Sequence, residues 1–229
     1  MYLTRVFLNP QRRATRDWLA SPQRLHAAVL AGFAEQSSAN RPLWRIDREQ
    51  HRFVLFVVSS DRPDLIHLVE QGGWSTHPPE VADYRRFLDQ IEAGRQYVFR
   101  LKANPVRSTK EGVAPLARGR VVNVGSRAQQ EEWLLGRAAS LGFVVPEDPA
   151  DFRSDAGVVL ARKNLVLTGR ETLRFSKLTS GERLNVTLAT AQFDGLLEVA
   201  DPASLRQALC QGIGRGKAYG CGLMTLAPR

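Results

Sequence analysis

Histidine is the side chain best suited to proton transfer near neutral pH, and one of the four histidines in this chain, His26, has an unusual position. The pair Ser21-Pro22 predicts the start of a helix. Leu25 and Val29 then recur at helical spacing and mark its buried face. His26 follows about 100° round, at the edge of that face, where the nearby helix N-terminus disfavours the imidazolium and keeps a neutral base available. Simple packing is the alternative role for such a histidine.

Other catalytic groups are scarce. The remaining histidines are expected to be structural or exposed, at positions His51, His67 and His77. The sequence has no Gly-x-Ser-x-Gly, no His-Glu-x-x-His and no repeated acidic pair of the kind that holds catalytic magnesium. Cys210 and Cys221 lack the spacing of a zinc site or a disulfide framework. We therefore expect neither a metal nor another cofactor.

A glycine-rich stretch, residues 212–223, has five glycines with two cations between them. It fails the Walker motif because Gln211 stands where glycine is required and Ala218 follows Lys217. It also fails the dinucleotide fingerprint, whose last glycine is replaced by Lys217. A backbone without Cβ atoms can approach a phosphate chain closely. We therefore expect phosphate contacts from Gly212, Gly214, Arg215, Gly216 and Lys217; a tight connection with several positive φ angles is the alternative.

Two further basic stretches fall in the second half of the chain. The candidates for phosphate contact are Arg100, Lys102, Arg107 and Lys110 in the first, and Arg162, Lys163, Arg170, Arg174 and Lys177 in the second. If Arg174 and Lys177 lie on a hairpin that turns at Thr179-Ser180-Gly181, the ribbon could lie along an RNA helix. A solvated charged face is the alternative.

The overall charge supports a polyanionic partner. The 229 residues include 32 Lys plus Arg against 23 Asp plus Glu, a formal net charge of +9. Such a field attracts nucleic acid. The sequence shows no polybasic block, no apolar run of roughly 18 residues and no signal peptide, so we expect no membrane partner and a cytoplasmic location.

The pattern of elements predicts that these residues are carried by two related halves. The first half is expected to have a strand at 2–8, a basic loop, a helix from residue 21, strands at 41–47 and 52–59, a helix at 61–70 and a strand between 76 and 87. This is the β-α-β-β-α-β order of a ferredoxin-like unit. The second half is expected to have a strand at 97–103, a helix at 129–141, strands at 158–167, 172–175 and 185–193, a helix at 201–211 and a strand at 222–226.

The order begins again after the first half, since Asn104-Pro105 ends its strand as Asn9-Pro10 ends the first. We predict an α+β fold of two tandem ferredoxin-like (RRM-like) domains, each an antiparallel sheet with two helices on one face. Their expected ranges are 1–92 and 96–229, with the boundary within 88–95 and additional hairpin material in the second domain.

Several stretches, taken together in order, resemble the CasE-type CRISPR-associated endoribonucleases, which process precursor CRISPR RNA. They are YLTRVFLNP at the N-terminus, SPQRLH at 21–26, FRLKANP at 99–105, FDGLLEVADP at 193–202 and GIGRGKAYGCGL at 212–223. No single stretch is specific, but the ordered set spans the chain.

The resemblance implies a basic cleft for a CRISPR repeat hairpin and metal-independent cleavage at the 3′ side of its stem, with no cofactor. His26 matches the family's catalytic histidine. Attack by a 2′-hydroxyl would leave a 2′,3′-cyclic phosphate and a 5′-hydroxyl. The resemblance also implies that the product stays bound and that the protein joins other subunits of the Cascade complex.

One position departs from the family pattern. Some members carry a tyrosine three residues before the histidine as a second catalytic group, and here that position is Gln23, which could position RNA but not act as an acid. Two alternatives remain at this point: a CRISPR RNA-binding scaffold of the same fold that does not cut, and a metal-dependent nuclease.

Overall fold

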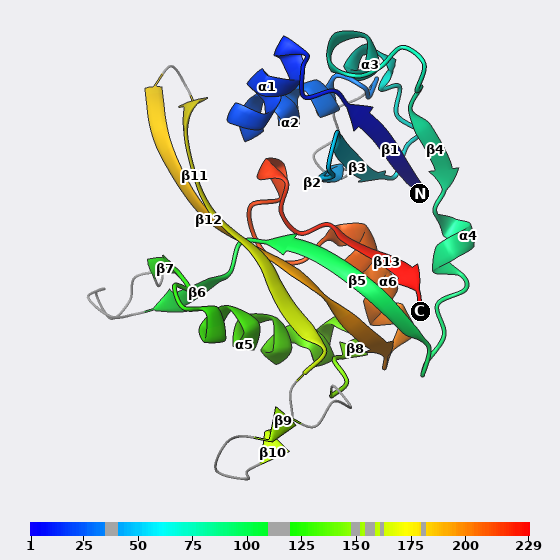
Figure 1. The fold of residues 1–229 in the computed structure, drawn as a ribbon, viewed down its shortest axis with the longest axis vertical. Helices are drawn as coiled ribbons and strands as arrows, with labels where there is room; N and C mark the ends of the chain where they lie inside the picture. Colours follow the sequence, from blue (N-terminus) through cyan, green and yellow to red (C-terminus); the bar gives the residue numbers. More distant parts are fainter. Residues whose placement is uncertain (35–40, 110–119, 148–151, 154–158, 161–162, 180–181) are drawn as a thin grey trace.

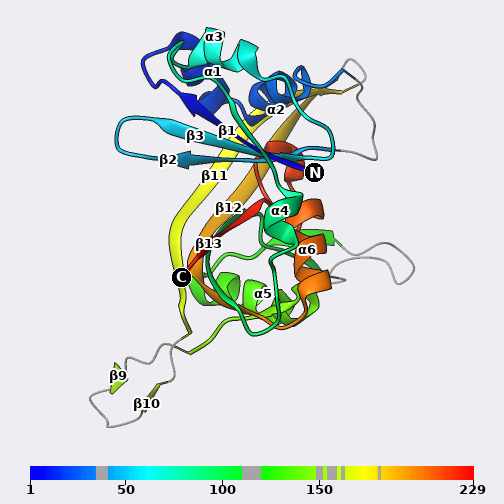
Figure 2. The ribbon, with the colours of Figure 1, turned by 90° about the vertical axis from the view of Figure 1, so that its right-hand side faces the viewer.

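The computed structural model describes residues 1–34, 41–109, 120–147, 152–153, 159–160, 163–179 and 182–229. Two antiparallel sheets are stacked, as Figure 2 shows from the side. The first sheet has the order β2-β3-β1-β4, built from β1 (Tyr2–Leu8), β2 (Leu43–Arg48), β3 (Phe53–Ser59) and β4 (Glu80–Asp83). The second has the order β11-β12-β5-β13, built from β5 (Gln96–Ala103), β11 (Leu165–Thr179), β12 (Glu182–Val199) and β13 (Met224–Pro228).

Both sheets follow the ferredoxin-like order, in which the first and third strands are central. The predicted fold class is confirmed. The first sheet ends at Asp83 and the second begins at Gln96, with the short helix α4 (Arg85–Leu88) between them. The exact domain ranges, 1–92 and 96–229, stay predictions.

The first sheet carries one helix more than the sequence indicated. Its helices are α1 (Arg13–Ala20), α2 (Pro22–Leu30) and α3 (Ile66–Gly72). Residues 13–20 were expected as a basic loop, and this prediction is wrong. The helix α1 is stabilised by tertiary contacts: Thr15 is buried and its hydroxyl donates to the carbonyl of Gly72, 2.6 Å away, while Trp18 is buried beside the same glycine.

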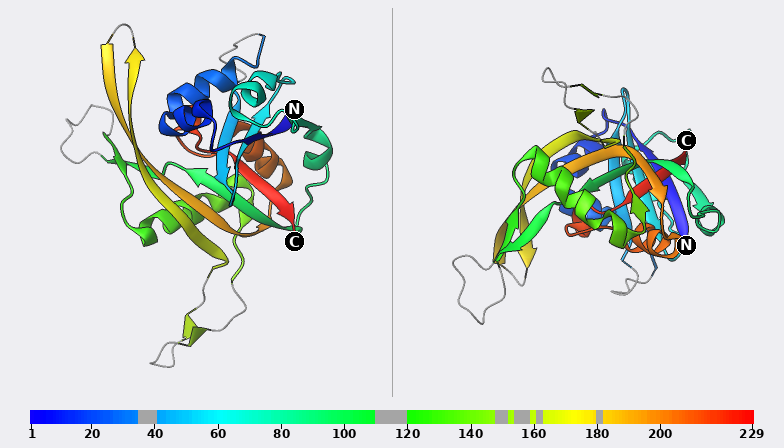
Figure 3. Two further views of the ribbon diagram at one scale, coloured as in Figure 1. Left: turned by 45° about the horizontal axis from the view of Figure 1, so that its top comes forward. Right: turned by 90° about the horizontal axis from the view of Figure 1, so that it is seen from below.

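The helices of the second sheet are α5 (Arg127–Ala138), continued by the 3₁₀ turn η2 (Ala139–Leu141), and α6 (Pro202–Gln211). Ser126 and Gln129 form a capping box at the start of α5, which fixes where that helix begins. Figure 3 shows α5 crossing a face of the sheet. A 3₁₀ turn η3 (Lys217–Tyr219) lies within the glycine-rich stretch. The short strands are β6 (Val106–Thr109), β7 (Arg120–Asn123), β8 (Phe143–Val144), β9 (Phe152–Arg153) and β10 (Val159–Leu160).

The predicted hairpin exists and is long. β11 pairs with β12 from Leu165↔Gly195 to Thr179↔Glu182, with a register shift between Leu167 and Gly169. The sequence predicted separate strands at 158–167 and 172–175. In the structure, residues 165–167 and 172–175 belong to one strand, because β11 continues through residues 168–171. The turn at Ser180 and Gly181 lies outside the described residues. In Figure 1 the hairpin extends past its own sheet to stand beside α1 and α2.

The two sheets share one hydrophobic core. Leu43 and Val58 of the first sheet pack with Phe99, Phe193 and the buried faces of α5 and α6 in the second. A smaller core under α1, α2 and α3 contains Leu25, Val29 and Trp44. The shared core fixes the first sheet on the second and so brings α2 close to the glycine-rich stretch.

Candidate functional site

His26 lies where the sequence predicted, on α2. The helix begins at Pro22, and the Ser21 side chain accepts from the amide of Arg24 at 3.5 Å. Leu25 and Val29 are buried, while His26 is half-buried. The indole Nε1 of Trp44, on β2, donates to Nδ1 of His26 at 3.2 Å. The imidazole is therefore held from beneath by the first sheet.

The surroundings of His26 favour its neutral form. Burial lowers the pKa of His26 below its ordinary value, and the charge of Arg41 lowers it further. The position of His26 near the start of α2 predicts that the helix dipole disfavours the imidazolium; burial and Arg41 are two further causes. Burial and the same Arg41 also lower the pKa of Lys217. Arg41 is thus close enough to act on both His26 and Lys217.

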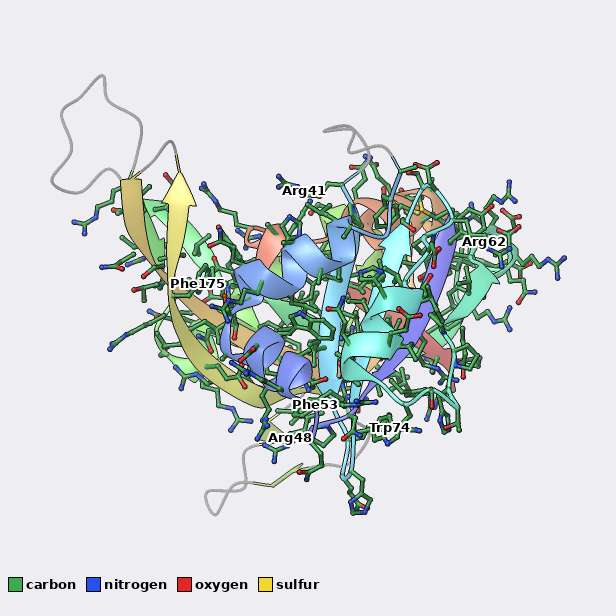
Figure 4. All side chains as sticks on the ribbon, turned by 90° about the horizontal axis from the view of Figure 1, so that it is seen from above. Arg41, Arg48, Phe53, Arg62, Trp74 and Phe175 are labelled. Atoms are coloured by element: carbon green, nitrogen blue, oxygen red, sulfur yellow. The ribbon has the colours of Figure 1, made fainter. Side chains whose placement is uncertain are left out.

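Residues far apart in the sequence meet at this point. The turn η3, which begins at Lys217, packs against α2. In Figure 4 Arg41 lies beside α2, and Phe175 projects from the hairpin toward the helices. An imidazole whose neutral form is favoured, with the charge of Arg41 close by and the turn that begins at Lys217 packed on its helix, is suited to binding a phosphate diester and stabilising the negative charge that grows on it. Gln23, half-buried, lies one turn before His26 and so on the same face of α2.

The glycines of the glycine-rich stretch are required by the backbone and by packing. All five, Gly212, Gly214, Gly216, Gly220 and Gly222, have φ between +76° and +92°. A Cβ on Gly220 would come within 2.6 Å of the Trp44 ring, and one on Gly214 within 3.2 Å of Trp133. The alternative reading of this stretch, a tight connection with positive φ angles, therefore holds. Phosphate contact is compatible with it, since Arg215 is exposed.

A cleft of about 600 Å³ separates the hairpin from the first domain's helices. One wall is formed by Trp18, Pro22, Leu25 and Trp44, and the other by residues of β11 and β12 together with Tyr219 and Gly220. On that second side, the rings of Phe175 in β11 and Tyr219 in η3 are in contact, with centroids 4.8 Å apart. His26 is next to Leu25 in α2 and bonded to Trp44, so it adjoins this cleft without lining it.

A second hollow, of about 400 Å³, lies at the other end of the glycine-rich stretch. Its lining includes Arg107, Arg137, Gly214 and Arg215. The Arg137 guanidinium stacks over the Trp133 ring at 4.4 Å. The stretch therefore borders the cleft through Gly220 and a basic hollow through Gly214.

The remaining residues predicted to bind RNA divide into three groups. Some are already paired within the protein: Arg100 with Asp194 and Asp47, Lys102 with Glu171, and Arg170 with the carbonyl of Gly125. Lys163 pairs with Glu147 just before β11, at the end of the strand away from the hairpin turn. Arg174 is exposed on β11. Lys177 is also on β11, but its side chain, like Lys110 and Arg162, lies outside the described residues.

Two residues at the site were not found from the sequence. Arg41 was assigned to a strand, although the strand begins at Leu43. Trp44 was expected only as a strand residue. His26 and Trp44 are 18 residues apart in the sequence, on a helix and on the strand that follows it, and no local pattern links them. Only the packing of α2 on the first sheet reveals their contact.

Among the residues that the structure describes, no group of three or more His, Cys, Asp or Glu side chains could hold a metal ion. Within the same part of the chain, no helix has the length and apolar character needed to cross a membrane.

Comparison with known proteins gives a consistent result. The family model described as "CRISPR associated protein" matches residues 1–228. The chain is 29% identical to the CRISPR-associated endoribonuclease Cse3 of Thermus thermophilus and 26% identical to the CRISPR system Cascade subunit CasE of Escherichia coli, each match covering 100% of both chains. It resembles a solved structure of CRISPR endoribonuclease Cse3 bound to a 19-nucleotide RNA, with a TM-score of 0.76, 26% identity and 100% coverage of both chains.

Proposed function

Because this chain belongs to the family of CRISPR-associated proteins, we propose that it is an endoribonuclease that cleaves the repeat hairpins of precursor CRISPR RNA and stays bound to the product as a Cascade subunit. The names of two full-length relatives, an endoribonuclease and a Cascade subunit, support both parts of this proposal. The similarity to an RNA-bound structure along the whole chain supports an RNA substrate.

The feature that carries the proposal is the half-buried imidazole of His26, whose pKa is lowered by burial and by Arg41, on a helix that packs against the turn beginning at Lys217. In the proposed reaction the 2′-oxygen attacks the adjacent phosphorus and the bond from phosphorus to the 5′-oxygen breaks. The 2′-hydroxyl loses its proton and the 5′-oxygen gains one, which leaves a 2′,3′-cyclic phosphate and a 5′-hydroxyl. His26 takes part in this proton exchange, and the two cations stabilise the phosphorane.

The reaction needs no metal in this proposal, because protein cations supply the charge that a metal would otherwise provide. Gln23 shares the face of α2 with His26 and supplies amide hydrogen bonds that orient the RNA backbone. It does not replace a catalytic tyrosine, since an amide is not an acid near neutral pH.

The RNA interface that we propose follows cations of the hairpin and of the glycine-rich stretch. Arg174 and Lys177 on the hairpin bind the stem, and the glycine-rich stretch follows the backbone toward the basic hollow of Arg107 and Arg215. Arg100 is left out, because its guanidinium joins Asp194 and Asp47 between the two sheets.

The test is cleavage of a repeat hairpin in EDTA by the purified protein. We expect cleavage that is lost when the scissile nucleotide carries a 2′-deoxyribose, and products that end in a cyclic phosphate. Binding without cleavage would instead support a scaffold, and cleavage only with added metal would support a metal-dependent nuclease.

The residue-level test is His26→Ala, for which we expect loss of cleavage with RNA affinity within about twofold of the wild type, since no phosphate-binding cation is removed. The control is His77→Ala, whose ring lies beside Trp74, far along the chain from α2. Full activity in His26→Ala would place the proton transfer elsewhere.

A further inference from the structure

The hydrogen bond between Trp44 and His26 determines more than the position of the ring. An indole nitrogen donates and has no lone pair to accept with. Nδ1 of His26 must therefore be the acceptor in this bond, and a neutral imidazole that accepts at Nδ1 carries its proton on Nε2.

Trp44 is fixed on both sides. It is only 3% exposed and packs in the core under α1, α2 and α3. On its other side, the Cα of Gly220 approaches so closely that any Cβ there would meet the ring at 2.6 Å. The indole is thus wedged between α2 and the glycine-rich stretch, and it cannot rotate away without moving one of them.

We propose that Trp44 is a positioning residue for the active site: its indole N–H selects the His26 tautomer that carries the proton on Nε2. The inference rests on the role of His26 in the proposed function. The inference also explains why residue 220 is a glycine apart from its positive φ angle, since a side chain there would displace the indole of Trp44.

The tautomer sets what His26 can do. With the bond to Trp44 intact, Nε2 offers an N–H that donates to a phosphate oxygen, where negative charge grows in the transition state. The lone pair that accepts the 2′-hydroxyl proton in the proposed function is on Nδ1, so the bond to Trp44 must break when His26 acts as the base, which requires α2 or the glycine-rich stretch to shift as RNA binds. The imidazolium cannot keep the bond at all, because two donors would then face each other.

The elements packed against α2 carry several charged and titratable groups, and among the described residues Arg41 is the one whose charge lowers the pKa of His26. Arg41 disfavours the imidazolium. In η3, Lys217 donates to the carbonyl of Gln211, and Tyr219 packs on Phe175. On the other packed elements, Arg13 pairs with Asp17 in α1, His67 of α3 contacts the carbonyl of Ala28, and Arg45 of β2 pairs with Asp47.

The direct test is a ¹⁵N NMR titration of the histidine-labelled wild-type protein. Above the pKa of His26 we expect Nδ1 to resonate as an unprotonated nitrogen and Nε2 as a protonated one. The opposite assignment would overturn the proposal, and this measurement needs no variant that folds.

The second test compares Trp44→Phe with Trp74→Phe. Phenylalanine removes the indole N–H, which stabilises only the neutral imidazole of His26. The pKa of His26 should therefore rise by roughly 0.5 to 1 unit. The rise should be seen both by NMR and in the pH profile of single-turnover cleavage. Trp74→Phe should leave it unchanged. An unchanged midpoint in a folded Trp44→Phe protein would overturn the inference.

The two proposals fail separately. If His26→Ala still cleaves RNA, the proposed role of His26 is wrong, whatever the tautomer. If His26→Ala is inactive and Trp44→Phe keeps the wild-type midpoint, the role of His26 stands and that of Trp44 does not.

Discussion

At the scale of single residues, the site depends on what surrounds His26. A histidine half-buried at the edge of a helix face is a common feature of packed proteins. Here it is bonded to Trp44 and affected by Arg41, and Arg41 also acts on Lys217. These contacts distinguish a candidate catalytic group from a packed one.

The charge of Arg41 gives a pH prediction. Arg41→Gln removes a cation that disfavours the imidazolium, so the pKa of His26 should rise toward its ordinary value. In the unfolded chain His26 has its ordinary pKa of 6.5, which is higher than its pKa in the folded protein. Because the unfolded chain therefore binds the proton first, the free energy of unfolding of the wild type falls as the pH falls through this region. In Arg41→Gln this loss should be smaller.

NMR titration of His26 and thermal unfolding between pH 5 and 8 would measure both effects of Arg41→Gln. The matched control is Arg62→Gln, since Arg62 is exposed and in Figure 4 lies well to the right of Arg41, toward the edge away from the hairpin. An unchanged pKa of His26 in Arg41→Gln would show that Arg41 does not act on His26.

At the scale of elements, the glycine-rich stretch and the hairpin have different tasks. The glycines allow a backbone with positive φ to pass against Leu43, Trp44 and Trp133. The hairpin, which stands beside α1 and α2 in Figure 1, carries the exposed Arg174. One element supports the site and the other is expected to hold the RNA.

Gly220→Ala tests the first task. At φ +79°, and with a Cβ only 2.6 Å from Trp44, alanine should destabilise the fold by about 1–3 kcal/mol and disturb His26 through the indole. Gly136→Ala is the control, because Gly136 lies within α5 with nothing inside 4 Å of the added atom. There alanine should be neutral or stabilise the helix by up to about 1 kcal/mol. Chemical denaturation of both variants measures the difference.

The hairpin is tested by Arg174→Ala combined with Lys177→Ala. Loss of phosphate contacts should weaken RNA binding and make the dependence of log K on log salt shallower by about one unit per lost contact. The control removes the same charge elsewhere, with Arg62→Ala and Arg86→Ala, both exposed in the first half of the chain. Binding isotherms at several salt concentrations measure this slope. An unchanged slope of log K against log salt would show that the hairpin does not contact the RNA phosphates.

At the scale of the whole molecule, one buried arginine joins the two sheets. Arg45 is 1% exposed and pairs with Asp47 through two bonds of 2.7 and 2.8 Å. Its other N–H groups donate to the carbonyl of Arg100 and the hydroxyl of Thr225 in the second sheet, and to the carbonyl of Leu223 at the end of the glycine-rich stretch. All five guanidinium N–H groups have an acceptor, so the pair is buried without an unsatisfied donor.

Arg45→Met should therefore destabilise the protein by about 3–5 kcal/mol, because Asp47 would stay buried with only Arg100, 3.5 Å away, as a partner. It should also loosen the approach of α2 to the glycine-rich stretch and so reduce cleavage. The control is Arg13→Ala, an exposed residue whose 4.0 Å pair with Asp17 contributes roughly 0–1 kcal/mol. Urea unfolding of both variants, followed by cleavage assays, would show whether the effect is specific to the sheet interface.

The sequence by itself determined the elements that depend on local signals. The cap at Ser21, the apolar stripe of Leu25 and Val29, the β-forming residues of β1 and the Asn-Pro pairs that follow β1 and β5 are short-range patterns. The first two placed His26 on the right helix. The ferredoxin-like order followed from these elements. Local polarity failed at residues 13–20, where Trp18 and Thr15 are buried by tertiary contacts.

Only the tertiary structure decided which residues meet at the site. Trp44 bonds to His26, Arg41 acts on Lys217, and Arg45 bonds to Leu223 and Thr225, because the two sheets dock through a shared core. The tertiary structure also shows which cations are already paired. The sequence predicted Arg100 and Lys102 as phosphate ligands, but in the fold each forms an ion pair with a carboxylate. Residue type and spacing carry no information about such contacts, which depend on packing between segments up to about 190 residues apart.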